Sequence, residues 1–237
     1  MMSRSNDAIR AYAERLQPQI RLFYRAAHAV TGNRRLAERV LSDAALNAYL
    51  NRNDWRERMS FREGVLRAIW TEGREQLKRE PEADWDWTGM TRDGLGEDRP
   101  LIAMLAAQPP EVQRAMLLRY GCSLSAKEIA ILTDSTGEQV RELLSRCQAR
   151  AERELNARGE NFKPFERYAA REFRAWMNRE NNEAIDAGYF LGVFERDAMG
   201  TNRPRRIAVR IIRWLLAVIG SLALAVGVWL IAVLMEM

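Results

Sequence analysis

The last part of this chain contains a run of 22 residues, 214–235, without a single charged side chain. As an α-helix such a run is about 33 Å long, which is enough to cross the roughly 30 Å hydrocarbon layer of a bilayer. A helix in a globular core rarely stays uncharged over that length, so the run predicts one transmembrane helix. The residues expected to mark this anchor are Trp214, Leu215, Trp229 and Met235.

The charges beside this run predict its orientation. Five arginines precede it within residues 203–213, whereas only Glu236 and Met237 follow it. Because arginine-rich flanks stay in the cytoplasm, the N-terminal bulk of the chain is expected to be cytoplasmic. Residues 1–25 are charged throughout and do not have the pattern of a secretory signal. The chain is therefore predicted to be a single-pass protein of the cell membrane.

The rest of the sequence predicts an all-α fold. Proline and glycine are sparse outside a few short stretches, and no run alternates Val, Ile or Thr with polar residues. Lys and Arg number 37 against 32 Asp and Glu, which gives a net charge of +5, and arginine supplies nearly all of the basic charge. Guanidinium groups suit phosphate contacts, but an excess of this size is also common on solvated helical surfaces.

Residues 109–155 have the layout of a helix-turn-helix unit. Two prolines can open the first helix, and Gly121 ends it. Ser125 followed by Glu128 is a capping-box pattern that starts a second, short helix, and residues 133–137 predict a turn. The next helix is expected to place Val140, Leu143, Leu144 and Cys147 inward and its polar and basic residues outward. A helix of this kind can enter the major groove of DNA.

These residues resemble region 4, the C-terminal DNA-binding domain, of extracytoplasmic-function-type bacterial sigma factors. The positions that match are Ser125, Glu128, Ile129, Ala130, Val140 and Leu144, while Arg141 replaces a lysine and Glu138, Gln139 and Leu143 depart from the pattern. The resemblance implies that the last helix binds promoter DNA. The residues expected to contact DNA are Gln139, Arg141 and Arg146, with Ser135, Ser145 and Arg150 beside them, the last two near phosphates.

The N-terminal part predicts a small helical core. Residues 7–49 indicate two helices separated by a turn at Thr31, Gly32 and Asn33, and a third helix is predicted over residues 60–79. The first two carry apolar side chains at three- and four-residue spacing, and the third has an apolar face of Val65, Leu66, Ile69 and Trp70.

Residues 23–50 resemble region 2 of the same family, the helical domain that binds RNA polymerase core and opens the promoter. The matching features are the Thr31-Gly32 turn and Ala37, Glu38, Asp43, Leu46 and Tyr49, whereas Arg39 and Ser42 stand where the family usually has Asp and Gln. The resemblance implies polymerase contacts at Glu38, Arg39, Ser42 and Asp43. The sequence then predicts a region 2-like domain over residues 1–80 and a region 4-like domain over 101–158.

Two further segments connect these domains and the membrane. Residues 81–100 predict an acidic linker that contains Trp85 and Trp87. The linker is interpreted either as a solvated tether whose tryptophans dock nearby, or as a mask for the basic DNA-binding surface. Residues 159–202 predict juxtamembrane helices rich in aromatic residues. Three roles are open for these helices: they form a spacer, they dock on the two domains as an inhibitor, or they bind the membrane surface. Residues 203–237 are the basic flank and the transmembrane helix.

No catalytic motif stands out in the sequence. It has no P-loop, nucleophile elbow, paired His/Glu metal motif or dinucleotide loop, so neither an enzyme, a cofactor nor a metal site is expected. His28 is expected to pack between helices. Cys122 and Cys147 lack metal-ligand spacing, and Cys147 is expected to act as a small apolar residue.

Two functions remain open. The first is a membrane-anchored, sigma-factor-like transcription regulator. Its partners are promoter DNA, RNA polymerase core and the membrane, with an anti-sigma protein or a protease as regulator. The alternative is a degenerate sigma-like adaptor, tethered to the membrane, that binds other proteins without starting transcription. The departures at Arg39, Ser42, Glu138 and Leu143 favour the adaptor, whereas the helix that Ser125 opens and the arginine-rich surface favour the regulator.

Overall fold

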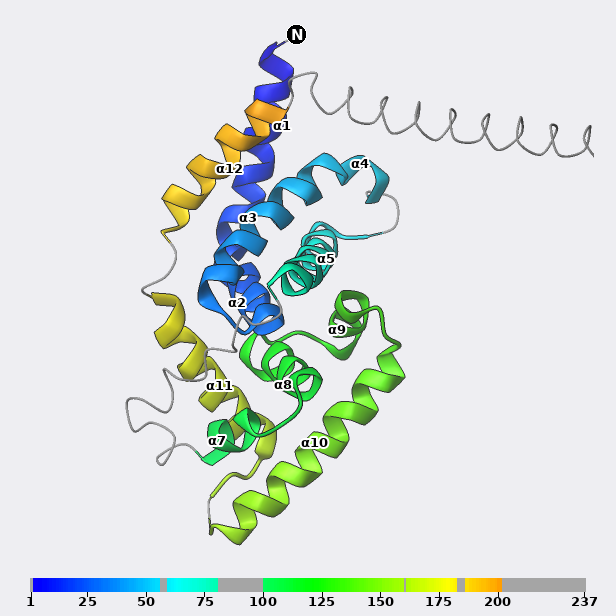
Figure 1. The fold of residues 1–237 in the computed structure, drawn as a ribbon, viewed down its shortest axis with the longest axis vertical. Helices are drawn as coiled ribbons and strands as arrows, with labels where there is room; N and C mark the ends of the chain where they lie inside the picture. Colours follow the sequence, from blue (N-terminus) through cyan, green and yellow to red (C-terminus); the bar gives the residue numbers. More distant parts are fainter. Residues whose placement is uncertain (1, 56–58, 81–99, 160, 183–185, 202–237) are drawn as a thin grey trace, which may run out of the picture. The chain divides into compact units, whose positions relative to one another are not determined.

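A computed structural model describes residues 2–55, 59–80, 100–159, 161–182 and 186–201 (Figure 1). Every regular element in these ranges is a helix, which confirms the predicted all-α class. Met1–Phe194 form one compact unit, and Glu195–Met237 form a second, of which only the end of helix α12 (Ala187–Thr201) is described.

The described helices include none that is long and apolar enough to cross a membrane. The predicted transmembrane helix, with Trp214, Leu215, Trp229 and Met235, lies outside the described residues, as do residues 81–99 of the predicted linker. Pro100, the last residue of that linker, begins helix α7.

The first predicted helix is divided in two. Helix α1 covers Met2–Leu16, a 3-10 turn η1 covers Gln17–Gln19, and helix α2 covers Ile20–Thr31. Pro18 explains the break, because proline has no N–H to donate within an α-helix and its ring clashes with the preceding turn. The prediction of only two helices over residues 7–49 was therefore wrong. The apolar periodicity hid the break because Leu16 and Ile20, on its two sides, are both buried.

Helices α2, α3 (Arg34–Leu50) and α5 (Phe61–Arg79) pack on one another and form the core of the N-terminal part, next to the short α4 (Arg52–Trp55). The predicted turn between α2 and α3 is confirmed: Gly32 takes a left-handed φ of 67°, which is easy for a residue without Cβ. The predicted third helix is also confirmed, and Ser60 and Glu63 form a capping box at its start. Buried alanines on α2 and α3 let the helices approach closely: Ala26, Ala27, Ala29, Ala37, Ala44, Ala45 and Ala48.

The second group of helices contains the predicted helix-turn-helix. It comprises α7 (Pro100–Ala106), α8 (Pro110–Met116), a π-helical turn η2 (Leu117–Gly121), α9 (Ala126–Thr133) and α10 (Gly137–Ala157). This group packs against the first, since α9 contacts α5 and η2 contacts α2. The Nε of Arg114 donates a hydrogen bond of 3.1 Å to the carbonyl oxygen of Val30 across this contact.

Helix α11 (Phe165–Asn182) packs mainly on η2 and also contacts α2 and α7. Its rings reach both helical groups: Phe173 lies 6.2 Å from Tyr120 of η2, and Trp176 lies 5.7 Å from His28 of α2, between ring centroids. Gly121 makes room for this helix, because a Cβ there would lie 2.3 Å from the Sδ of Met177. Helix α11 is thus docked on both helical groups.

Candidate nucleic-acid interface

Both helices of the helix-turn-helix begin with a capping box. The Ser125 Oγ accepts from the Glu128 N–H at 3.2 Å, while Glu128 Oε2 accepts from the Ser125 N–H at 2.8 Å, as the sequence predicts. Thr136 and Gln139 make the same reciprocal pair at the start of α10, and this second capping box was not predicted. Asp134 closes α9 in the left-handed conformation, with φ 52°. These caps satisfy N–H groups that a helix start leaves unpaired, and so fix where α10 begins.

The inward face of α10 matches the prediction. Val140 and Leu144 are buried, and Leu143 and Cys147 are half-buried. The same stripe continues through Ala151 and Leu155, which are also buried. The remaining side of the helix faces solvent and carries the predicted DNA contacts.

All six predicted DNA-binding residues are exposed: Ser135, Gln139, Arg141, Ser145, Arg146 and Arg150. The five residues on α10 do not share one face, because residues two positions apart in an α-helix are separated by about 200° around the helix axis. Gln139, Arg146 and Arg150 lie along one flank, and Arg141 and Ser145 lie along the other. A DNA duplex that lies along one flank is therefore contacted by only some of the predicted DNA-binding residues of α10.

The partners of these side chains differ. Gln139 Oε1 accepts from the Thr136 N–H at 2.9 Å, which uses its carbonyl oxygen in the cap. Arg146 pairs with Glu142 at 3.7 Å and Arg150 with Glu154 at 3.1 Å. Arg141 has no ion-pair partner among the described residues. It is the predicted contact whose guanidinium group is most available to a phosphate or a base.

Ser135 lies in the turn, where its hydroxyl donates to the Thr133 carbonyl oxygen at 3.3 Å. The outermost side of α10 carries Glu138 and Glu142, both exposed. Carboxylates at these positions repel phosphates, so a bound duplex has to approach along a flank instead of squarely on the outermost side.

Two ion pairs, which were not predicted, join the helix-turn-helix to α5. Arg62 Nε lies 2.9 Å from Glu128 Oε1, and Arg67 Nη2 lies 3.8 Å from Asp134 Oδ1. Glu128 therefore caps α9 and also holds it on α5. No local pattern reveals these pairs, because their members are far apart in sequence.

The four predicted polymerase contacts lie along one side of α3: Glu38, Arg39 and Asp43 are exposed and Ser42 is half-buried. This side faces the C-terminal half of α5. Arg39 pairs with Glu80 at 2.7 Å, and Arg35 shares the same carboxylate at 2.6 Å. We call the four predicted polymerase contacts, Glu38, Arg39, Ser42 and Asp43, together with Glu72 and Glu80, the α3–α5 polar surface. Its charges are partly neutralised within the chain.

Asp43 has a perturbed carboxyl group on this surface. Although the residue as a whole is exposed, partial burial of its carboxyl group, and secondarily the carboxylate of Glu72, raise the pKa of that group. A carboxyl group with a higher pKa in the folded state binds its proton more tightly there, so its contribution to stability falls as pH rises above the ordinary value near 4.

We therefore expect Asp43→Asn to increase the free energy of unfolding at about pH 7, by less than about 1 kcal/mol because solvent screens the group. The gain should shrink as the pH is lowered towards 4. Urea denaturation at both pH values measures it, with Glu38→Gln as the exposed control on the same helix. A loss of stability at neutral pH in Asp43→Asn would show that the carboxylate is held by favourable contacts.

The histidine and the cysteines occupy structural positions. His28 is buried between Tyr24 and Trp176, as expected for a packing histidine. Both cysteines are free thiols, and burial raises the pKa of Cys122 to about 12, which keeps it protonated. In the part of the chain that the structure describes, no group of three or more His, Cys, Asp or Glu side chains is placed to hold a metal ion.

Comparison of this chain with protein-family models, with curated proteins and with solved structures finds no match.

Proposed function

We propose that this chain is a membrane-anchored, sigma-factor-like transcription regulator, with a region 2-like and a region 4-like helical part. In this proposal α10 binds promoter DNA, and the α3–α5 polar surface meets RNA polymerase core. A transmembrane helix over residues 214–235 holds the chain at the cell membrane. The observation that carries the proposal is the doubly capped α9–turn–α10 unit, which presents Arg141 without an ion-pair partner among the described residues.

Two features support a role in binding duplex DNA. The turn between α9 and α10 is only three residues long, which gives the compact geometry of helix-turn-helix proteins. The recognition helix of such a unit contacts bases through its N-terminal residues, and Arg141 lies in the first turns of α10.

The test measures binding of the full-length protein to DNA fragments selected from a random pool. We expect Arg141→Ala to weaken specific binding roughly five- to a hundredfold, since a good base contact is worth about 1–3 kcal/mol. If Arg141 contacts a phosphate, the slope of log K against the logarithm of salt concentration should instead become shallower by about one unit. The control is Arg167→Ala, which removes an arginine of α11 that is also exposed. Unchanged affinity and salt dependence in Arg141→Ala would remove α10 from the mechanism.

A second candidate function is the sigma-like adaptor that binds other proteins at the membrane. The observation that favours it is the internal use of the predicted contacts: Arg39 pairs with Glu80, and Gln139 is engaged in its cap. The exposed carboxylates of Glu138 and Glu142 on the outermost side of α10 also favour the adaptor. Co-purification of RNA polymerase core with the full-length protein separates the two functions, because only the regulator requires that complex.

A further inference from the structure

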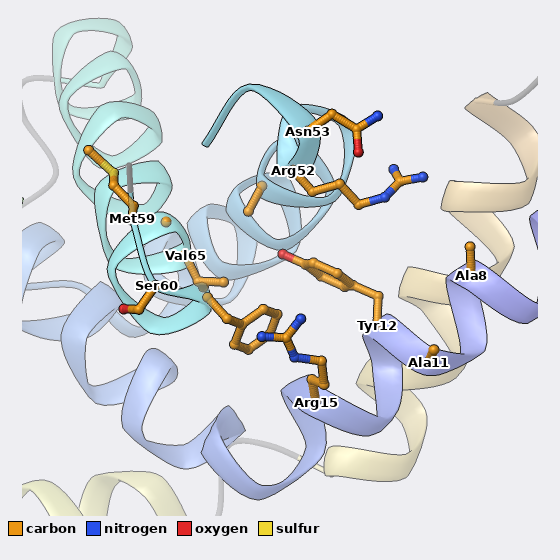
Figure 2. A pocket seen from close by; sticks show the side chains of 12 residues that line it. Ala8, Ala11, Tyr12, Arg15, Arg52, Asn53, Met59, Ser60 and Val65 are labelled. Carbon is orange, nitrogen blue, oxygen red and sulfur yellow. The ribbon is translucent and has the colours of Figure 1, made fainter. Parts of the chain in front are cut away.

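An open cavity of about 570 Å³ lies between α1, the C-terminal end of α3, α4 and the start of α5 (Figure 2). The space exists because the residues that face it from three helices are small: Ala8, Ala11, Ala48 and Gly64. Its volume falls within the range of small-molecule sites, roughly 300–1,000 Å³. None of the residues assigned above to DNA or to polymerase lines it.

Two arginines from distant parts of the chain border this cavity. The Cζ of Arg15 lies 4.3 Å from the centroid of the Phe61 ring, and the Cζ of Arg52 lies 4.0 Å from that of Tyr49. Arg52 Nη1 also donates to the Tyr49 carbonyl oxygen at 2.7 Å. In the described ranges neither guanidinium group pairs with a carboxylate. Stacking on a ring uses the face of a guanidinium group and leaves its N–H edge for an anion.

Tyr12 forms the aromatic wall between these two cations, as Figure 2 shows. Its ring is held by Phe61 at 5.1 Å and Tyr49 at 5.3 Å, and Phe194 stacks on it at 5.6 Å, between centroids. Burial raises the pKa of the Tyr12 phenol, so the hydroxyl stays neutral beside the two arginines and can donate a hydrogen bond. Asn53 and Ser60 add neutral polar groups to the lining.

We propose that this cavity binds a free nucleoside monophosphate, with the phosphate at the arginines that border the cavity, Arg15 and Arg52, and the base against Tyr12 and the alanine-lined walls. Two guanidinium groups match the charge of a phosphomonoester, which is about −1.5 to −2 at neutral pH. The Tyr12 ring and the alanine side chains of the lining suit a flat heterocycle better than they suit a bare phosphate ion. The site requires neither the DNA-binding nor the polymerase-binding role proposed above.

The experiment titrates the purified full-length protein with AMP, GMP, CMP, UMP, inorganic phosphate and a short single-stranded DNA, using calorimetry. At least one nucleoside monophosphate should bind more tightly than inorganic phosphate. Arg15→Gln and Arg52→Gln should each weaken that binding about tenfold or more, because each removes a charge-assisted contact. Arg10→Gln, an exposed arginine on the same helix, is the matched control and should leave binding unchanged.

Ala11→Phe gives a second test, because it adds a large side chain to the lining of the cavity and keeps both arginines in the chain; binding should be lost while the helical circular dichroism spectrum is retained. Four results would overturn the proposal: no binding of any nucleotide at millimolar concentration by folded protein, binding insensitive to both arginine variants, equal affinity for inorganic phosphate, or binding of the single-stranded DNA alone.

Discussion

Phe173→Ala is expected to lower the free energy of unfolding by about 3–5 kcal/mol, the usual cost of deleting a buried phenylalanine side chain. Phe173 is fully buried and stacks on Tyr120 in the π-helical turn η2. Its Cβ lies 3.7 Å from the position that a Cβ on Gly121 would take, so the helix backbone is in close contact with the turn. Surrounding helices cannot easily collapse into the space that its ring leaves.

Chemical denaturation followed by circular dichroism measures this loss. Tyr189→Ala is the control, because that ring is 73% exposed and its removal should change stability by no more than about 0.5 kcal/mol. A Phe173→Ala protein as stable as the parent would mean that α11 does not pack on η2 in solution. Hydrogen exchange distinguishes a global loss of stability from a local release, since a local release would deprotect only the amides of α11.

Much of the fold was predictable because its signals are local. The Ser125–Glu128 capping box and the apolar spacing of Val140 and Leu144 identified the start of α9 and the inner face of α10. Apolar spacing also concealed the break at Pro18. It shows which side of a helix is buried, but it does not show whether the backbone hydrogen bonds of the helix continue. Helix α7 was not anticipated either: it is only seven residues long, and it begins at the last residue of the predicted linker.

The candidate interface was predictable only in part. Helical periodicity correctly placed Arg141, Arg146 and Arg150 on the surface, but it does not reveal which of them form ion pairs. The contact of Arg62 with Glu128, and the position of Arg15 and Arg52 at one cavity, depend on how helices pack. Such tertiary contacts join residues distant in sequence, and a single sequence carries no local signal for them.

Helix α11 determines where a stable fragment of this chain can end. The resemblance to sigma factors ends near residue 156, which makes a fragment ending at Gly159 look like a natural unit. The next buried side chains all lie beyond that point: Phe162, Phe165, Ala169, Phe173, Trp176 and Met177. They cover Tyr120 and Gly121 in the helix-turn-helix group and His28 in the N-terminal group.

A chain that ends at Gly159 is therefore expected to lose its native fold. Burial of each large apolar side chain contributes about 1.5–3 kcal/mol. Apart from Ala169, the buried side chains named above are five large ones, and together they are comparable to the whole stability of a domain, roughly 5–15 kcal/mol. The fragment should melt without a cooperative transition and bind a hydrophobic dye, whereas a chain that ends at Thr201 keeps α11 and should melt cooperatively. Equal melting temperatures for the two fragments would contradict this account. If it holds, and if the chain is the membrane-anchored regulator proposed above, a proteolytic cut that frees a folded regulator has to fall beyond α11.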